Sequence, residues 1–215
     1  MNRRVLEVDA LALPDHYYLD GNDTCYYAGE YTAGEGHAYS DTNQLILNLK
    51  KSVDRRGRPE WQYKERAITQ AAQIFRAALN EHARLTLVPI PPSKARTDPA
   101  YDDRMLRLLH QVAANRPYEV RELVVQVAST PAAHLADRRP TPDELVANYQ
   151  LEERLAEPEA ETIFIVDDVL TTGSHYKAVK QVLQQRFPKA KIYGLFVARR
   201  VPKSAADAFD VVDLE

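Results

Sequence analysis

Two adjacent carboxylates, Asp167 and Asp168, are the residues of this sequence best placed to do chemistry. They follow the apolar run at residues 163–166, and a short segment rich in hydroxyl groups separates them from a helical pattern that begins at Tyr176. Carboxylate oxygens accept hydrogen bonds from sugar hydroxyls and suit a hydrated divalent cation, which prefers hard oxygen ligands. The pair therefore indicates a site for a diol, a metal ion or both.

The segment that follows the two acids has the composition of a phosphate-binding turn. It consists of Thr171, Thr172, Gly173, Ser174 and His175. Hydroxyl groups, a glycine that lets the backbone approach a ligand, and the unpaired N–H groups of the following helix together favour a bound phosphate. Next to two carboxylates, such a turn predicts a pocket for a ribose phosphate.

A simpler interpretation of this stretch is an ordinary strand followed by a helix cap. Asp and Thr are favoured at helix N-termini without any role in ligand binding. For the two aspartates alone this interpretation is the stronger one. The order of apolar run, two acids, Thr-Thr-Gly and helix favours the ligand-binding interpretation instead.

Two apolar strands are expected to position these groups. The run at 163–166 shows no alternation, which is typical of a central strand of a parallel sheet with both faces covered. A second apolar run begins at Leu85 and ends at the prolines 89, 91 and 92, which supply no N–H group to a sheet. Because parallel strands end on the same edge of a sheet, the segments that follow the two runs should lie close together.

The segment after the second apolar run supplies positive charge. It contains Ser93, Lys94 and Arg96, and we expect these residues to bind an anion near Asp167 and Asp168. On their own, the two cations would be interpreted as solvated loop charges.

Together, these motifs resemble the phosphoribosyl pyrophosphate (PRPP) signature of the type I phosphoribosyltransferases. The resemblance implies that Asp167 and Asp168 hold the ribose hydroxyls, directly or through Mg²⁺, and that residues 171–175 wrap the 5-phosphate. It also implies that Ser93, Lys94 and Arg96 contact the pyrophosphate, which leaves when a nitrogen heterocycle attacks the ribose. Two departures from the signature are His175, where a threonine is usual, and Thr171, where members that act on purines such as hypoxanthine often have an acid.

The segment around the second apolar run resembles a particular branch, the ComF-like phosphoribosyltransferase-domain proteins. The residues that carry this likeness are Val88, Pro89, Ile90, Pro91, Lys94, Arg96, Tyr101 and Asp102. Pro99 and Ala100 stand where that family tends to have Arg-Gly, and a chain whose only cysteine is Cys25 has no counterpart of its zinc module.

A long polar segment at 129–150 separates the strand expected at 123–128 from the signature strand. Loops of this length in a compact domain are often functional covers. By analogy with the flexible loop of phosphoribosyltransferases, Arg138 and Arg139 would reach the pyrophosphate, and His134 would meet it or the acceptor. The alternative is a surface excursion with no role in binding.

The expected fold is α/β, with a mostly parallel sheet of about five strands flanked by helices. Helical periodicity predicts helices over about 61–82, 102–115 and 176–186, and a further strand is expected at 191–198. The tyrosine- and glycine-rich residues 1–60 predict a small N-terminal hood with a hairpin and a helix capped by Ser40 or Asp41. Residues 61–215 would form the phosphoribosyltransferase-like domain.

Composition excludes several other classes of protein. The 28 basic and 31 acidic residues make direct nucleic-acid binding unlikely, because no basic excess would displace counterions from a phosphate backbone. We expect neither a signal peptide nor a membrane span, and hence a cytoplasmic protein, by family analogy a homodimer. An enzyme is the leading hypothesis; the alternatives are a PRPP- or nucleotide-binding regulator without turnover and a competence- or DNA-associated accessory protein.

Overall fold

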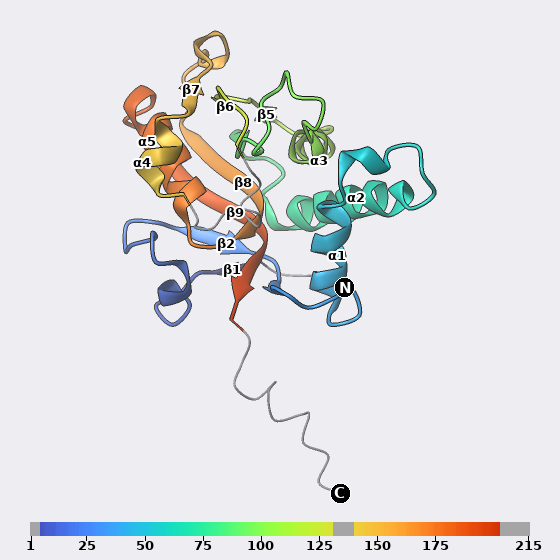
Figure 1. Cartoon of the computed structure of the whole chain (residues 1–215). Coiled ribbons are helices and arrows are strands. Elements are labelled where there is room, and N and C mark those ends of the chain that lie inside the picture. The colour runs from blue at the N-terminus through green and yellow to red at the C-terminus, as the bar shows by residue number, and fades with distance from the viewer. Residues whose placement is uncertain (1–4, 131–139, 203–215) are drawn as a thin grey trace, which may run out of the picture.

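The chain folds around a mostly parallel β-sheet, which the computed structural model describes over residues 5–130 and 140–202 (Figure 1). Within these residues the sheet has seven strands, and six of them follow the order β1-β2-β9-β8-β4-β5. The strands are β1 (Leu6–Glu7), β2 (Cys25–Tyr27), β3 (Glu30–Thr32), β4 (Leu85–Pro89), β5 (Tyr118–Val120), β8 (Thr162–Leu170) and β9 (Lys191–Val201). Apart from β1, which runs antiparallel to β2, all neighbours are parallel.

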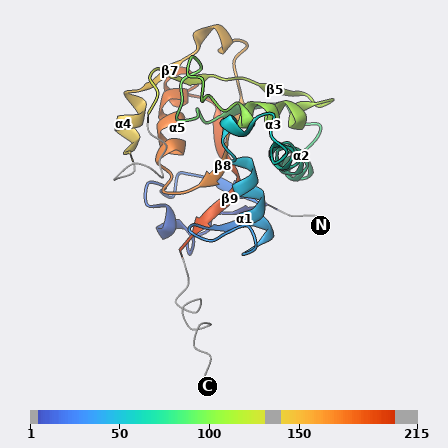
Figure 2. The same cartoon turned by 45° about the vertical axis from the view of Figure 1, so that its right-hand side comes forward.

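Helices cover both faces of the sheet, which confirms the predicted α/β class (Figures 1 and 2). One face packs against α1 (Asp41–Leu49), α2 (Trp61–Ala78) and α3 (Arg104–Ala113), and the other packs against α5 (Ser174–Arg186). The short helix α4 (Pro142–Val146) lies beside α5. Three 3₁₀ turns, at Leu13–His16, Val53–Arg55 and Glu153–Leu155, complete the helical elements of the described residues.

The central strand β8 contributes side chains to both cores. Ile163 and Ile165 pack with α5, whereas Val166 packs with the α1–α3 layer, as expected for a strand whose side chains alternate between two covered faces. The unbroken apolar run read from the sequence therefore corresponds to burial on both sides.

The N-terminal strands differ from the hairpin that the sequence predicted. β2 and β3 do not pair with each other; both run parallel to β9 in one continuous register, with Cys25 opposite Gly194 and Glu30 opposite Arg199. They act as one strand beside β9, interrupted at Ala28 and Gly29. This pairing buries Cys25 and Tyr27 in the main core, which an isolated hairpin would leave exposed. The division of the chain at residue 60 stays a prediction. The predicted cap of α1 is confirmed, because the Ser40 side chain accepts from the Asn43 N–H.

The strand expected at 123–128 also lies elsewhere. β6 (Val124–Gln126) pairs antiparallel with β7 (Tyr149–Leu151) in a separate two-stranded sheet, and β5 occupies the edge of the main sheet beside β4. β5 has three residues, too few for a periodicity signal. The segment 129–150 is not a plain loop: it contains α4, started by a capping box between Thr141 and Glu144, and β7.

A close backbone approach at Gly194 gives a test of this arrangement. A Cβ atom there would lie 2.7 Å from Cys25 Sγ and 2.8 Å from Phe196 Cε2. We expect Gly194→Val to lower the free energy of unfolding by about 2 kcal/mol, because the side chain would push apart β9, β2 and α5. Gly36→Ala, where a Cβ meets nothing within 4 Å, is the control and should change it by under about 0.5 kcal/mol in urea unfolding. Equal effects of both variants would contradict the parallel β2–β9 packing.

Candidate functional site at the carboxyl end of β8

The two predicted acids lie where β4 has ended and β8 continues. β4 pairs with β8 as far as Pro89 opposite Val166, and the Ile90 N–H still donates to the Val166 carbonyl at 2.9 Å. Beyond this point β8 pairs only with β9, up to Leu170. Asp167 and Asp168 therefore belong to the strand rather than to the loop after it. They lie on the part of β8 that has β9 on one side and no β4 residue on the other.

Asp168 is buried and holds two cations. Its side chain is 4% exposed; Oδ2 accepts from Arg104 Nε at 3.1 Å and Nη2 at 2.6 Å, and Oδ1 lies 3.2 Å from Lys50 Nζ. Burial alone would raise the pKa of this carboxyl, but Lys50 and Arg104 together hold its pKa below the usual aspartate value. Asp168 is thus an ionised carboxylate inside the α1–α3 layer.

Arg104 extends this ion pair into a network. Its Nη1 donates to Asp102 Oδ2 at 2.9 Å, and the same oxygen accepts from Lys64 Nζ at 2.6 Å. Lys64 is fully buried, also donates to the Lys51 carbonyl at 2.7 Å, and lies over the Trp61 ring. The network links α2, the start of α3 and β8.

Asp167 has a different environment. It is partly exposed, and its Oδ1 accepts from the Asp168 N–H at 2.7 Å, which satisfies an amide that has no β4 partner. Burial of the carboxyl, with the neighbouring Asp168 charge, raises the pKa of Asp167 to about 7. Burial raises the pKa of the Tyr149 hydroxyl, and the negative charge of Asp167 raises it further. The Tyr149 hydroxyl lies 2.9 Å from His175 Nδ1, so Asp167 and the last residue of the turn share a neighbour in β7.

The turn after β8 is held from one side by the N-terminal segment. His16 Nδ1 hydrogen-bonds the Thr171 carbonyl, and the Tyr18 N–H donates to the Thr172 carbonyl at 3.0 Å. The single cis peptide of the described residues is at Pro158, so the peptides after Thr171 and Thr172 are trans. In a trans peptide the N–H points opposite to the carbonyl; hence the amides of Thr172 and Gly173 point away from His16 and Tyr18.

Gly173 is required at this turn. Its φ of +86° lies in the left-handed region, and a Cβ there would lie 2.8 Å from Leu19 Cδ2. Thr172 and Ser174 are buried and their hydroxyls lie 3.3 Å apart. Among residues 5–130 and 140–202, no acceptor is found for the N–H groups of Thr172 or Gly173. The turn thus presents free amides at the N-terminus of α5.

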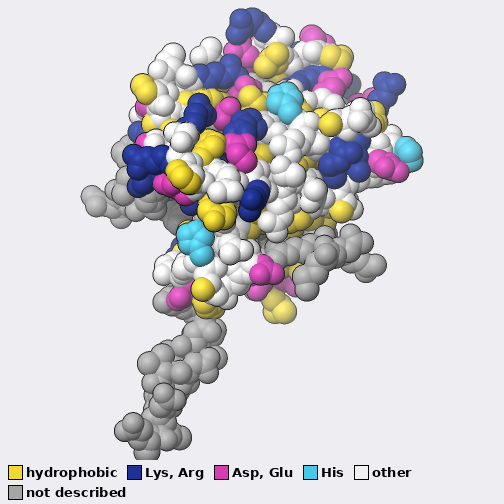
Figure 3. All heavy atoms as spheres, turned by 90° about the vertical axis from the view of Figure 1, so that its right-hand side faces the viewer, with side chains coloured by type: hydrophobic (Ala, Val, Ile, Leu, Met, Phe, Trp, Pro, Cys, Tyr) yellow, Lys and Arg dark blue, Asp and Glu magenta, His cyan; other side chains and the backbone are white. Residues whose placement is uncertain are grey.

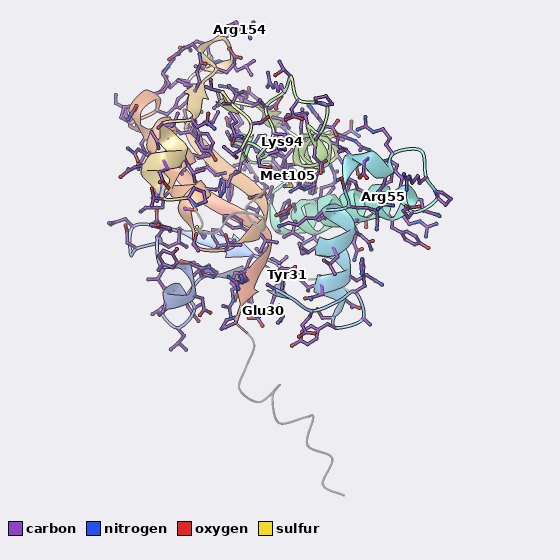
Figure 4. The ribbon with its side chains drawn as sticks, viewed as in Figure 1. Glu30, Tyr31, Arg55, Lys94, Met105 and Arg154 are labelled. Atoms are coloured by element: carbon purple, nitrogen blue, oxygen red, sulfur yellow. The ribbon has the colours of Figure 1, made fainter. Side chains whose placement is uncertain are left out.

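The basic segment after β4 is held by neighbours of its own. The Ser93 carbonyl accepts from the Thr130 N–H at 2.8 Å, and Arg96 Nη2 lies 2.5 Å from Glu122 Oε2. The pKa of Asp98 is lowered, first by a hydrogen bond from the Ser129 hydroxyl and to a smaller extent by the positive charge of Lys94. In the view of Figure 4, Lys94 lies above Met105 of α3, while Glu30 and Tyr31 lie at the opposite end of the molecule. Arg96 is committed to Glu122, so an anion would have to compete for it.

Other predicted residues give no contact to compare. Arg138, Arg139 and His134 lie outside the described residues.

Basic and acidic side chains are interspersed over the face that α1–α3 present in Figure 3. No helix in the described part of the chain is both long and apolar enough to cross a membrane.

The Mg²⁺ site predicted at Asp167 and Asp168, with water or ribose hydroxyls as further ligands, stays a prediction. Within residues 5–130 and 140–202 there is no cluster of three His, Cys, Asp or Glu side chains that would hold a metal ion. Both oxygens of Asp168 face cations, which leaves Asp167 as the available carboxylate. Mg²⁺ could be accommodated here only with most of its oxygen ligands supplied by a phosphorylated substrate and water.

Sequence reasoning missed the partners of the predicted residues. Lys50, Arg104, Tyr149 and His16 contact them from four separate elements. A signal was present for two of them: Lys50 ends an amphipathic helix, and Arg104 follows two aspartates at the start of another. His16 and Tyr149 lie more than 20 residues from the turn, and no local pattern marks them.

Replacing each of the two aspartates by asparagine should change the stability of the protein in opposite directions. The folded-state pKa of Asp167 is raised, so its charge costs stability increasingly from about pH 4 to about pH 7. Asp167→Asn should therefore stabilise the protein by about 1 kcal/mol at pH 8 and leave it unchanged near pH 4. The pKa of Asp168 is lowered, so its contribution is present above about pH 4; Asp168→Asn should cost roughly 3 kcal/mol at pH 8.

Urea unfolding of the two variants at both pH values checks this prediction. The Asp→Asn change is the same in both, so each variant is the control for the other. Destabilisation of equal size by both variants at pH 8 would contradict the assigned environments.

Comparisons with known proteins leave the family open. No protein-family model matches the sequence, and no curated protein sequence matches it. Among solved structures, the chain is similar to the Helicobacter pylori xanthine-guanine-hypoxanthine phosphoribosyltransferase, with 15% sequence identity and a TM-score of 0.26, over 83% of this chain and 86% of that chain. A superposition this loose assigns neither family nor substrate, so the functional conclusion depends on the residues themselves.

Proposed function

We propose that this protein binds PRPP at the carboxyl end of β8 and transfers its phosphoribosyl group to a nitrogen heterocycle, releasing pyrophosphate. One observation carries the proposal. The free amides of Thr172 and Gly173 precede α5 directly after β8, whose last turn-side residues include two carboxylates in different ionisation environments. The groups proposed to bind the phosphate and the diol thus lie within seven residues, 167–173.

The turn would hold the 5-phosphate. Unpaired N–H groups at a helix N-terminus attract an anion through hydrogen bonds and through the helix dipole. The hydrogen bonds from His16 and Tyr18 to the carbonyls fix the turn in this orientation before any ligand arrives. Preorganised amides bind an anion without the cost of ordering a loop.

The two carboxylates would orient the ribose. Asp167 is the more accessible acceptor, and Asp168 is the buried one with a permanent charge. Mg²⁺ would arrive with PRPP, whose own oxygens supply most of its ligands, so that the protein contributes at most one or two carboxylate oxygens.

The reaction requires charge stabilisation more than covalent chemistry. The bond between ribose C1 and the pyrophosphate oxygen breaks, a C1–N bond to the heterocycle forms, and the nitrogen loses its proton. Cations stabilise the negative charge that develops on the departing pyrophosphate, and fixed positions for the reactants reduce the entropic cost. Lys50, Lys94 and Arg96 are the candidates among the described residues.

A second candidate function is PRPP or nucleotide binding without turnover. It is favoured by the engagement of both Asp168 oxygens and by His175, which contacts Tyr149 instead of offering a hydroxyl to the phosphate. The finer suggestions, a ComF-like relationship and a homodimer, remain parts of the proposal that need their own tests.

Pyrophosphate release separates the two functions. We expect release from PRPP and Mg²⁺ when one member of a panel of purines, pyrimidines and related heterocycles is added. Calorimetry with PRPP on the same preparation is the parallel measurement. Tight binding without release for any base would favour the regulator, and no binding would overturn both candidates.

The phosphate turn has a separate test. Thr172→Ala should weaken ribose 5-phosphate binding by about tenfold, because the Thr172 hydroxyl contacts both the Ser174 hydroxyl and its N–H group and so supports the turn. Thr69→Ala, an exposed position in α2, is the matched control and should bind like the wild type. A dissociation constant unaltered by Thr172→Ala in calorimetry would count against the phosphate role.

A further inference from the structure

The two oxygens of Asp168 are held very differently. Oδ2 accepts from both Nε and Nη2 of Arg104, whose side chain is 18% exposed, in a fixed forked geometry. Among residues 5–130 and 140–202, Oδ1 has Lys50 as its one partner, at 3.2 Å, and the Lys50 side chain is 42% exposed. One oxygen is therefore committed to a buried partner, whereas the other faces a flexible cation at the surface.

Lys50 is also the surplus cation of the network. Along the ion pairs that run from α2 to β8, the positive charges of Lys64 and Arg104 match the negative charges of Asp102 and Asp168 in number. When Lys50 departs, Asp168 remains paired with Arg104, and Asp102 remains paired with Lys64 and Arg104. Because 42% of the Lys50 side chain is exposed, its ammonium can leave Oδ1 for water or for another anion without first being uncovered.

The backbone of Lys50 is anchored, whereas its long side chain is partly exposed. The residue caps the C-terminus of α1, where its N–H donates to the Ile46 and Asn48 carbonyls. The helix thus delivers an ammonium group with four rotatable bonds to the part of β8 that lacks a β4 neighbour, beside the acids.

From these contacts we infer that Lys50 is an exchangeable counter-ion of Asp168: when PRPP binds, its ammonium moves from Oδ1 to the diphosphate, and Oδ1 accepts a ribose hydroxyl. This inference rests on the proposed function and deepens it. It explains how a carboxylate with both oxygens occupied can still recognise a sugar. It also assigns the pyrophosphate contact to a residue outside the predicted basic segment 93–96.

If Lys50 exchanges in this way, it has opposite effects on the affinity for the two halves of PRPP. Pyrophosphate gains the Lys50 contact, whereas ribose 5-phosphate, which lacks the diphosphate, only competes with Lys50 for Oδ1. Lys50→Ala should therefore weaken binding of magnesium pyrophosphate by about tenfold or more, the usual size for a lost charged hydrogen bond. The same variant should bind ribose 5-phosphate as tightly as the wild type or more tightly.

Calorimetry with these two probes on the full chain tests the inference. Lys50→Arg keeps the charge and should restore at least part of the pyrophosphate affinity. Lys51→Ala is the matched control, because only the backbone of Lys51 makes hydrogen bonds within the described residues: its carbonyl accepts from Lys64 and its N–H donates to the Asn48 carbonyl. Far-UV circular dichroism and thermal unfolding confirm that each variant is folded.

Each possible result of the calorimetry either supports or overturns the inference. Loss of pyrophosphate affinity with ribose 5-phosphate affinity kept supports the exchange. Equal loss for both probes would mean that Lys50 only supports the structure, and unchanged pyrophosphate affinity would mean that it does not contact the diphosphate; either result overturns the inference. If the wild-type protein binds ribose 5-phosphate and PRPP, these failures leave the proposed function intact; if it binds neither, the proposed function itself fails.

Discussion

A carboxylate enclosed between α1, α3 and β8 stays ionised only if cations accompany it, and this requirement connects most of the elements around the site. Asp168 takes Arg104 from the start of α3 and Lys50 from the end of α1. Arg104 in turn needs Asp102, and Asp102 is shared with the buried Lys64 of α2. Removing one of the more deeply placed members, Lys64, Asp102 or Arg104, costs about 3–5 kcal/mol, because its partner is left charged and unpaired. The apolar packing builds the layers, and this network fixes how the three helices meet the end of the strand.

The same strand end combines two kinds of order. On one side, the ion network holds Asp168 in a fixed state; on the other, residues 16–19 hold the turn that opens α5. Between them lies Asp167, partly exposed, with a pKa of about 7 because of burial and its charged neighbour. A group that changes charge near neutrality, free amides and a surface cation are thus gathered within a short stretch of the chain. Rigid support with a few accessible groups is what a ligand site requires.

The extent to which this arrangement could be predicted follows from the range of the interactions involved. The unbroken apolar runs of β4 and β8 and the periodicity of α1, α2, α3 and α5 are local signals, and they predicted the fold class. The carboxylates and the Thr-Gly turn were likewise visible because strand, turn and helix are contiguous. The parallel pairing of β2 and β3 with β9 was not predictable, because it depends on contacts between residues about 170 positions apart. Lys50 and Arg104 stand at the ends of predicted helices, but their pairing with Asp168 is a long-range contact, and no local pattern marks His16 or Tyr149.

The first measurement to make is a crystal structure of the protein with PRPP and Mg²⁺. We expect the 5-phosphate within hydrogen-bond distance of the amides of Thr172 and Gly173, with the ribose hydroxyls at Asp167 and Asp168. We also expect that residues 16–19 still hold the carbonyls of the turn. PRPP bound away from the carboxyl end of β8, or a turn whose amides remain unliganded while the ribose is bound, would contradict the account.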